Sequence, residues 1–420
     1  MTLLSPTSPR GQPTFAVATR FWAKLGCISF GGPAGQIAIM HRELVERRAW
    51  VSEDDFLHAL NFCMLLPGPE AQQLATWIGW RLHGLRGGLA AGGLFFLPSF
   101  FVLTALSCAY VVWGHTPAVD GLLYGLRPAV LALIFMAAWR IGTKALKTWW
   151  HRSLAVVTLV LSWVGLPFPA IIGMAAVAGY LIRSEGRNAP SSSAPASWRT
   201  IRARGVRGAL IFAGFWGALY MMSATALGRG RDIALFFTQA AFVTFGGAYA
   251  VLPYVFDASV RHYAWLQPAQ VIDGLALGET TPGPLIMVVT FIGFLAGWGD
   301  PVAGHSLASG LIGAAIATAF TFLPSIALIL TLAPLVERAQ AVPAVRRSLA
   351  GITAAVVGVI VRLGLDLSAA VLVAPMRGSL NVFPCALMAL SLIALARKVS
   401  TPAVIVAAAL LGVLAKFLGH

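Results

Sequence analysis

Apolar stretches long enough to cross a membrane recur along almost the whole chain, and this feature most limits what it can fold into. Hydrophobic residues make up 58% of the 420 residues and charged residues only 11%, whereas a soluble protein carries roughly 25% charged residues. A bilayer leaves helices or closed barrels as spanning structures, because every backbone polar group must be paired within the protein. The stretches are continuously apolar and do not alternate as barrel strands do. The sequence therefore predicts an all-α polytopic membrane protein.

About 13 apolar segments can be recognised, and a spanning helix needs about 20 such residues. Several segments are short or are interrupted by Gly and Pro, which is typical of re-entrant segments. The expected segments are 15–40, 56–81, 88–112, 121–140, 153–165, 168–182, 208–227, 233–255, 270–296, 306–336, 349–365, 379–396 and 402–418.

The chain also contains an internal repeat. Sliding the sequence by 215 residues aligns residues 21–69 with 236–284 without a gap, and 11 of these 49 positions are identical. The shared motifs are Phe-Gly-Gly at 30–32 and 245–247, Trp at 50 and 265, and Pro-Gly-Pro at 67–69 and 282–284. The offset then becomes 226, because Leu-Pro-Ser at 97–99 matches 323–325, so an insertion falls around residues 297–305.

The repeat divides the chain into four parts. We expect an N-terminal repeat at residues 1–182 and a C-terminal repeat at residues 228–420. Between them we expect a cytoplasmic linker at residues 183–207, which is rich in Ser, Ala, Pro and Arg, and a connecting transmembrane helix at residues 208–227.

Loop charges indicate how the two halves are oriented. The net charge is +15, and the basic residues cluster in short loops, as expected for cytoplasmic loops of membrane proteins rather than for binding of nucleic acid. Loops 81–86 and 140–152 are basic, whereas loop 113–120 has no Lys or Arg. In the second half the charges are exchanged. Loop 297–305, equivalent to 81–86, has no Lys or Arg, and loop 337–347, equivalent to 113–120, has three Arg. The sequence therefore predicts an inverted-topology repeat with broken or re-entrant helices, a frequent architecture of secondary transporters. Arg229, Arg231 and Arg377 are exceptions, since they fall in loops placed outside.

The repeated motifs predict helix breaks at membrane depth. Paired glycines weaken a helix, and proline removes a backbone N–H. A broken helix is tolerated at membrane depth only where it is buried in protein or lines a cavity. The restarted half-helix exposes N–H groups and about half a positive charge at its N-terminus, so it binds oxyanions. We expect both halves to contribute such ends to one anion site near the bilayer midplane. The alternative is that Gly and Pro only permit kinks and close packing. The residues concerned are Gly31, Gly32, Pro67, Gly68, Pro69, Gly246, Gly247, Pro282, Gly283 and Pro284.

Polar residues near the breaks complete the predicted site. Lys24 and Arg127 are candidates for pairing with the anion, and Glu70 and Glu279 for carrying a coupling proton, because charges at membrane depth usually face a cavity or a partner. The alternatives are snorkelling for Lys24 and structural ion pairs for the other three. Gln73 flanks the first break, and the hydroxyl groups of Thr280 and Thr281 either bind the anion or cap the second break.

Sequence motifs of enzymes and pumps are missing. There is no HExxH, GxSxG or CxxCH motif and no GxxxxGKS/T loop, so we expect neither an enzyme nor an ATP-driven pump. The four cysteines form no CxxC pair, so we expect no metal and no cofactor. The expected partners are a small oxyanion and membrane lipids, with no nucleic acid, and a homodimer is left open.

Three motifs together resemble the chromate ion transporter family, in its long two-domain form: FGGPAGQIAIMH at 30–41, LPGPEAQQLATWIGW at 66–80 and GETTPGPL at 278–285. The resemblance covers nearly the whole chain and implies chromate export from the cytoplasm across the bacterial inner membrane, with resistance to chromate. Without the resemblance, the residues indicate only a small anion, so a sulfate or other small-oxyanion transporter is the alternative. One departure from the repeat is Ala248 in place of Pro33. The family residues implied are Gly31, Gly32, Pro33, Trp50, Pro67, Gly68, Pro69, Gln73, Gly246, Gly247, Trp265, Glu279, Thr280, Pro282, Gly283 and Pro284.

Overall fold

The fold was analysed in a computed structural model, which describes residues 13–29, 32–114, 116–181, 198–245, 247–332, 343–373 and 380–418. Within these ranges the secondary structure is helical, with one isolated bridge between Val373 and Leu380. Five helices are long and apolar enough to cross a membrane: Glu70–Trp113, Pro117–Ala145, Gly208–Ala226, Leu307–Leu332 and Val345–Leu372. The predicted helical membrane protein is confirmed.

The same order of helices occurs twice, on either side of α8 (Trp198–Ala226). The first half contains α1 (Phe15–Ile28), α2 (Gly32–His41), the π-helical turn η1 (Arg42–Arg47), α3 (Glu53–Cys63), α4 (Glu70–Trp113), α5 (Pro117–Ala145), α6 (Trp149–Trp163) and α7 (Phe168–Leu181). The second half contains α9 (Gly230–Val243), α10 (Ala248–Asp257), the π-helical turn η2 (Ala258–His262), α11 (Pro268–Thr280), the 3-10 turn η3 (Leu285–Met287), α12 (Val288–Trp298), α13 (Leu307–Leu332), α15 (Pro343–Leu372), α16 (Val382–Ala396) and α17 (Thr401–Phe417).

The repeat extends to unusual backbone details. Ala49 and Ala264, which are 215 positions apart, both have positive φ angles, of 50° and 49°. The next residue in each half, Trp50 or Trp265, donates its backbone N–H over 2.8 Å to the carbonyl of Leu44 or Ser259. Because positive φ is rare outside glycine, its recurrence at one register shows that the two halves share a fold and not only a composition.

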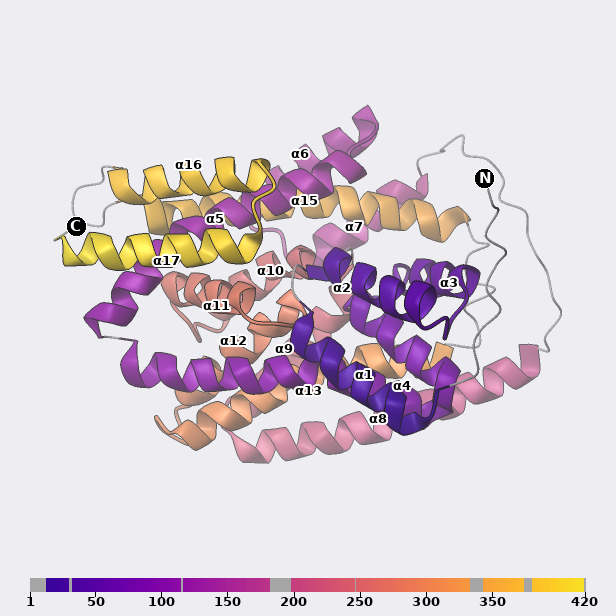
Figure 1. The fold of residues 1–420 in the computed structure, drawn as a ribbon. Coiled ribbons are helices and arrows are strands. Elements are labelled where there is room, and N and C mark those ends of the chain that lie inside the picture. Colours follow the sequence, from indigo (N-terminus) through magenta and orange to yellow (C-terminus); the bar gives the residue numbers. More distant parts are fainter. Residues whose placement is uncertain are drawn as a thin grey trace.

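The first apolar segments are pairs of short helices and not single spans. Figure 1 shows α1, α2 and α3 to the right of the centre and α10, α11 and α12 to the left. The long helix α4 turns sharply at Gly84, which has a φ of 60°. In the second half a longer loop between α12 and α13 replaces this turn, where the sequence predicted an insertion. The expected linker at 183–207 lies largely outside the described residues, and α8 begins at Trp198.

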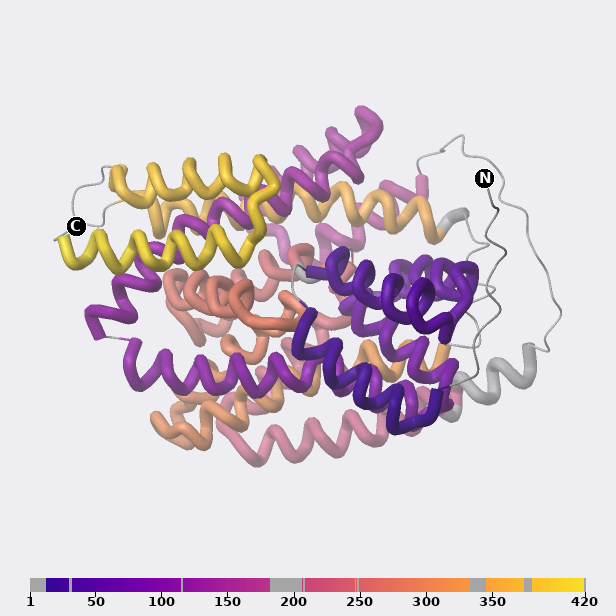
Figure 2. The backbone as a smooth tube through the Cα atoms, viewed as in Figure 1, coloured from indigo at the N-terminus to yellow at the C-terminus, as the bar shows by residue number. Residues whose placement is uncertain are grey.

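The two halves exchange their last helices. In Figure 2, α16 and α17 lie along α5 of the first half, and α6 and α7 pack in the same way against α15. Glycines allow both contacts: a Cβ on Gly125 would lie 2.8 Å from Cα of Gly412, and one on Gly351 would lie 2.9 Å from Cα of Gly179. Because Gly125 is equivalent to Gly351, these contacts are reciprocal, as in a two-fold symmetric dimer.

The loop that replaces the Gly84 turn is organised by a buried carboxylate, Asp300. Asp300 accepts backbone N–H bonds from Arg229 at 2.7 Å, Val302 at 2.9 Å and Ala303 at 2.8 Å. Burial on its own would raise the pKa of Asp300, but the N–H groups of Ala303, Arg229 and Val302 outweigh it and hold the pKa below the ordinary 3.8. The ionised carboxylate therefore joins the α8–α9 turn to the α12–α13 loop.

We predict that Asp300→Asn destabilises the protein near neutral pH by about 1–3 kcal/mol, because three N–H groups lose a charged acceptor. A folded-state pKa below 3.8 makes the stabilisation complete above that pH and lost as pH falls through the lower folded pKa. In detergent, the unfolding temperature of the variant should therefore lie below that of the wild type at pH 7, and this gap should close on acidification. A gap that is absent at pH 7, or unchanged in acid, would contradict this role. Asp54→Asn, on an exposed carboxylate, is the control.

Candidate functional site

Helices are interrupted at both Phe-Gly-Gly motifs. α1 ends at Ile28 and α2 begins at Gly32, whose φ is 70°, and α9 ends at Val243 before α10 begins at Ala248. Gly247 directly precedes α10 with a φ of 98°, a conformation that favours glycine. Gly31 and Gly246, also predicted to lie in the site, fall outside the described residues. Both breaks thus depend on one positive-φ glycine, although Pro33 is replaced by Ala248 in the repeat.

Both Pro-Gly-Pro motifs also separate two helices. α3 ends at Cys63 and α4 begins at Glu70, directly after Pro69. α11 ends at Thr280, and the turn η3 follows Pro284. Gly68 and Gly283 have φ angles of 126° and 121°. All four sequence-predicted interruptions are present in the structure.

Hydrogen bonds between the halves connect the two kinds of break. The N–H of Gly68 donates over 2.8 Å to the carbonyl of Thr244, and the N–H of Gly283 donates over 2.7 Å to the carbonyl of Ser29. Ser29 and Thr244 occupy equivalent positions, each just before a Phe-Gly-Gly motif. Each Pro-Gly-Pro loop of one half therefore satisfies a carbonyl at the Phe-Gly-Gly break of the other half.

We call the region where Gly68 meets Thr244 and Gly283 meets Ser29 the crossing. The serines of the repeated Leu-Pro-Ser motif add hydrogen bonds there. Ser99 donates its hydroxyl to the carbonyl of Pro282, and Ser325 donates to Oε1 of Gln72 over 3.0 Å. A Cβ on Gly68 would lie 2.7 Å from the hydroxyl of Ser325, and one on Gly283 would lie 2.8 Å from Cβ of Ser99. These serines were not among the predicted site residues, although the motif repeats at an offset of 226 residues.

A cavity of about 830 Å³ reaches this crossing. It is bounded by α2, α3, the first residue of α4 and the end of α5, and also by Gly247 and Tyr249 of the second half. The two Phe-Gly-Gly breaks meet there, because a Cβ on Gly247 would lie 4.0 Å from Cγ of Pro33. The N-terminal ends of α2 and α10 therefore border one open space, and no side chain caps α10 at Gly247.

Charged groups border the cavity. Glu70 is the first residue of α4 and lines it, together with the cations Lys144 and Arg42. Tyr249 lines the cavity and donates its hydroxyl to Oε1 of Glu279, which is half-buried. Predicted proton carriers from both halves therefore lie in or directly behind the cavity wall.

Other predicted site residues have local or structural partners. Gln73 donates to the carbonyl of Pro67 over 2.7 Å and so closes the first break. Thr280 and Thr281 donate to carbonyls of the last turn of α11, at 2.7 and 3.1 Å. These contacts correspond to the capping alternative. Lys24 is exposed on α1 and is not among the residues that line the cavity.

Arg127 is held by a carboxylate that the sequence did not single out. Its Nε and Nη2 donate to the two oxygens of Asp273 at 2.8 and 3.0 Å, and the hydroxyl of Tyr110 donates to the same carboxylate at 3.0 Å. Asp273 is fully buried and belongs to the other half, so this is the structural ion pair given as the alternative for Arg127. The sequence offers one indication of this role: Asp273 is a lone carboxylate in an apolar segment, with no partner nearby in sequence.

Metal-ligating residues do not cluster in the described parts of the chain. No group of three or more His, Cys, Asp or Glu side chains suited to a metal ion occurs there. The four cysteines are free thiols, far apart in sequence. The chemistry available at the crossing is therefore that of backbone amides, hydroxyls, carboxylates and cations.

Comparisons with known proteins match both halves. The family model described as Chromate transporter matches residues 17–180 and again residues 231–413. A chromate transport protein of Cupriavidus metallidurans is 31% identical over 97% of this chain and 95% of its own length, and one of Pseudomonas aeruginosa is 31% identical over 82% and 79%. An uncharacterized transporter of Bacillus subtilis is 28% identical over 35% of this chain but 75% of its own length. No solved structure matches.

We predict that Gly283→Ala and Gly68→Ala each destabilise the protein by about 1–3 kcal/mol, because a side chain at positive φ is strained and would also meet the serine of the other half. Thermal unfolding in detergent measures the effect. Gly93→Ala is the control, because Gly93 lies in α4 with ordinary φ and open space around its Cβ. Equal effects at all three positions would contradict the proposed crossing.

Proposed function

Because the chain belongs to the chromate transporter family, we propose that it is a secondary transporter that exports chromate from the cytoplasm and so confers resistance. The observation that carries the proposal is the match of the family model to each half. We place the protein in the bacterial inner membrane as a multi-pass protein, which its apolar helices support. Export of a dianion from a negative-inside cell is favoured by about 2.3 kcal/mol per charge for each 100 mV.

The binding site that we propose lies where the N-termini of α2 and α10 border the cavity. Each half-helix exposes backbone N–H groups and about half a positive charge at this end, which suits a doubly charged oxyanion. Lys144 and Arg42 line the same cavity and attract anions to it. Glu70 opposes a bound dianion at the start of α4, so a protonated Glu70 favours occupancy. The site therefore links anion binding to the protonation of its carboxylates.

We further propose that residues 1–182 and 228–420 are inserted with opposite orientations, joined by the linker 183–207 and the helix 208–227. The exchange of basic and neutral loops between the halves supports this arrangement. In that orientation the cavity faces the cytoplasm, because Lys144 belongs to the basic loop 140–152.

Radiolabelled chromate uptake into inverted membrane vesicles tests the function. We expect uptake that rises with an inside-positive potential and that excess unlabelled sulfate reduces only partly. Vesicles without the protein are the control for leakage. Absence of chromate uptake, with sulfate taken up instead, would establish the alternative of a sulfate or other small-oxyanion transporter. Absence of both would contradict the proposal.

We predict that Glu279→Gln flattens the pH dependence of chromate uptake without preventing membrane insertion, because glutamine cannot exchange a proton. Tyr249→Phe should shift the pH profile, since it removes the hydroxyl that donates to Glu279. Glu43→Gln, on a carboxylate paired with Arg47 away from the cavity, is the matched control and should leave the profile unchanged. A wild-type profile for Glu279→Gln would remove this carboxylate from coupling.

A further inference from the structure

The protein has a second cavity at the position equivalent to the first. It lies between α10, η2, α15 and the turn that joins α6 to α7. At the offset of 215 residues, residues of the first cavity fall on residues of the second: Ala38 on Pro253, His41 on Phe256, Arg42 on Asp257 and Glu46 on Arg261. One wall of each cavity is therefore built from equivalent residues of the two halves.

The two cavities differ greatly in size. The first has a volume of about 830 Å³ and the second only about 60 Å³. Glu46 and Glu53, which line the first, have side chains that are 57% and 52% exposed, so that cavity reaches the surface. One copy is open and the other is nearly filled.

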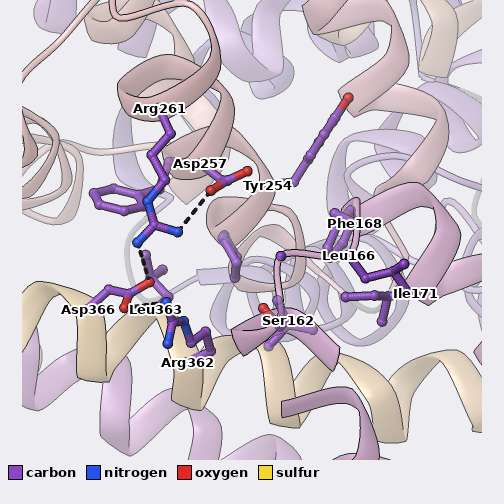
Figure 3. Close-up of a pocket in the computed structure, with 14 residues that line it drawn as sticks. Ser162, Leu166, Phe168, Ile171, Tyr254, Asp257, Arg261, Arg362, Leu363 and Asp366 are labelled. Carbon is purple, nitrogen blue, oxygen red and sulfur yellow. Dashed lines mark hydrogen bonds and ion pairs between the residues drawn. The ribbon is translucent and has the colours of Figure 1, made fainter. Parts of the chain in front are cut away.

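A network of ion pairs closes the second cavity (Figure 3). Arg261 reaches from η2 to Asp257 on one side and to Asp366 of α15 on the other, both at 3.1 Å. Asp366 also accepts from Arg362 at 3.0 Å. The contact between Arg261 and Asp366 is the important one, because it joins two separate helical elements across the cavity.

The turn between α6 and α7 fills the remaining space. Phe168 stacks on Tyr254 with 5.3 Å between ring centroids, and the guanidinium of Arg362 lies 5.0 Å from the ring centroid of Trp163. The equivalent turn, at residues 397–400, contributes none of the described residues that line the first cavity. The closed copy is thus plugged by a turn and the open copy is not.

The ion-pair positions keep their complementarity in the first half with the signs reversed. Arg261 corresponds to Glu46 at the offset of 215, and Asp366 corresponds to Arg140 at the offset of 226. Asp257 corresponds to Arg42. A central cation between two anions in the second half has therefore become a central anion between two cations in the first. Two of the three ion pairs thus keep their attraction with reversed signs, whereas Arg362 corresponds to Met136 at the offset of 226.

The reversed residues do not pair with one another in this structure, and Arg140 interacts electrostatically with Glu279 instead. Glu46 contacts His41 at 3.0 Å instead of Arg42 or Arg140. Within the described parts of the chain Arg42 and Arg140 form no ion pair within 4.0 Å. Arg42 and Glu46 line the open cavity, and Arg140 lies next to its lining residue Ile141 on α5.

We propose that the two charge sets are the two gates of one transport pathway, with Arg261 and Asp366 closing the outer gate here and Glu46 and Arg140 closing the inner gate in the opposite state. The inference rests on the proposed function and adds the residues that alternate. Exposed ion pairs stabilise by only about 0.2–1 kcal/mol each, which suits a gate that must open in every cycle. Opening of one gate favours closure of the other, because the pathway alternates between two states.

Labelling of single cysteines tests the outer gate in the full-length protein without substrate. All four native cysteines are first replaced. Ser162→Cys reports on the closed cavity from outside intact cells, and Ala38→Cys reports on the open cavity from inverted vesicles, both with a membrane-impermeant maleimide. We expect Asp366→Asn, which removes the anionic partner of both Arg261 and Arg362, to speed labelling at position 162 by about two- to five-fold and to slow it at position 38.

The opposite responses at the two positions distinguish a gate from a local contact. Faster labelling at position 162 with no change at position 38 would overturn the proposal, since local loosening alone explains it. No change at either position would also overturn it. Arg261→Gln is the second variant if Asp366→Asn does not insert, and it should change both rates in the same directions. Arg47→Gln, on a surface ion pair outside both cavities, should change neither rate.

A crosslink tests the inner gate. We expect a short bis-maleimide to join Glu46→Cys to Arg140→Cys more readily when Asp366→Asn is present, and the crosslinked protein to lose anion uptake. A crosslink yield that does not depend on residue 366 would contradict the alternation. Labelling and crosslinking require no substrate, so their failure in a protein that takes up chromate refutes only the gates. Failure of uptake in the unmodified protein refutes the function instead.

Discussion

Backbone amides and carbonyls at a broken helix must be paired when the break lies in an apolar environment, and this constraint shapes the whole protein. The described parts of the chain contain four such breaks, and the two halves contribute to each other's. Gly68 donates to Thr244 and Gly283 donates to Ser29, so each half satisfies a carbonyl at a break of the other half. The exchange of α6 and α7 for α16 and α17 then follows the same two-fold relation.

The same crossing concentrates the chemistry of the protein. Because the breaks meet, helix N-termini from both halves border one cavity, and Tyr249 of the second half lines a space formed mainly by the first. The structural ion pair of Arg127 with Asp273 also joins the halves, but away from that cavity. The ion pair of Arg127 with Asp273 and the proposed anion site therefore use different residues of the two halves.

The sequence predicted the breaks well because Gly and Pro act locally on the backbone. The Phe-Gly-Gly and Pro-Gly-Pro motifs recur in one register, and the change of offset located the longer α12–α13 loop. The partners of these groups were not predictable, since Thr244 and Gly68 are far apart in sequence and only the packing of the halves brings them together. The same holds for Asp273 beside Arg127 and for Tyr249 beside Glu279. Lys24 shows the reverse: a charge in an apolar segment that remains exposed.

A crosslink between the two Phe-Gly-Gly breaks tests the crossing most directly. Pro33→Cys and Gly247→Cys are introduced into a cysteine-free protein with a protease site in the linker, because a Cβ on Gly247 lies 4.0 Å from Cγ of Pro33. Asp120→Cys with Lys416→Cys, an exposed ion pair between the halves, is the positive control. The structure predicts that a short bis-maleimide keeps the cleaved halves together in both proteins. Separation of the halves in the Pro33→Cys/Gly247→Cys protein alone would contradict it.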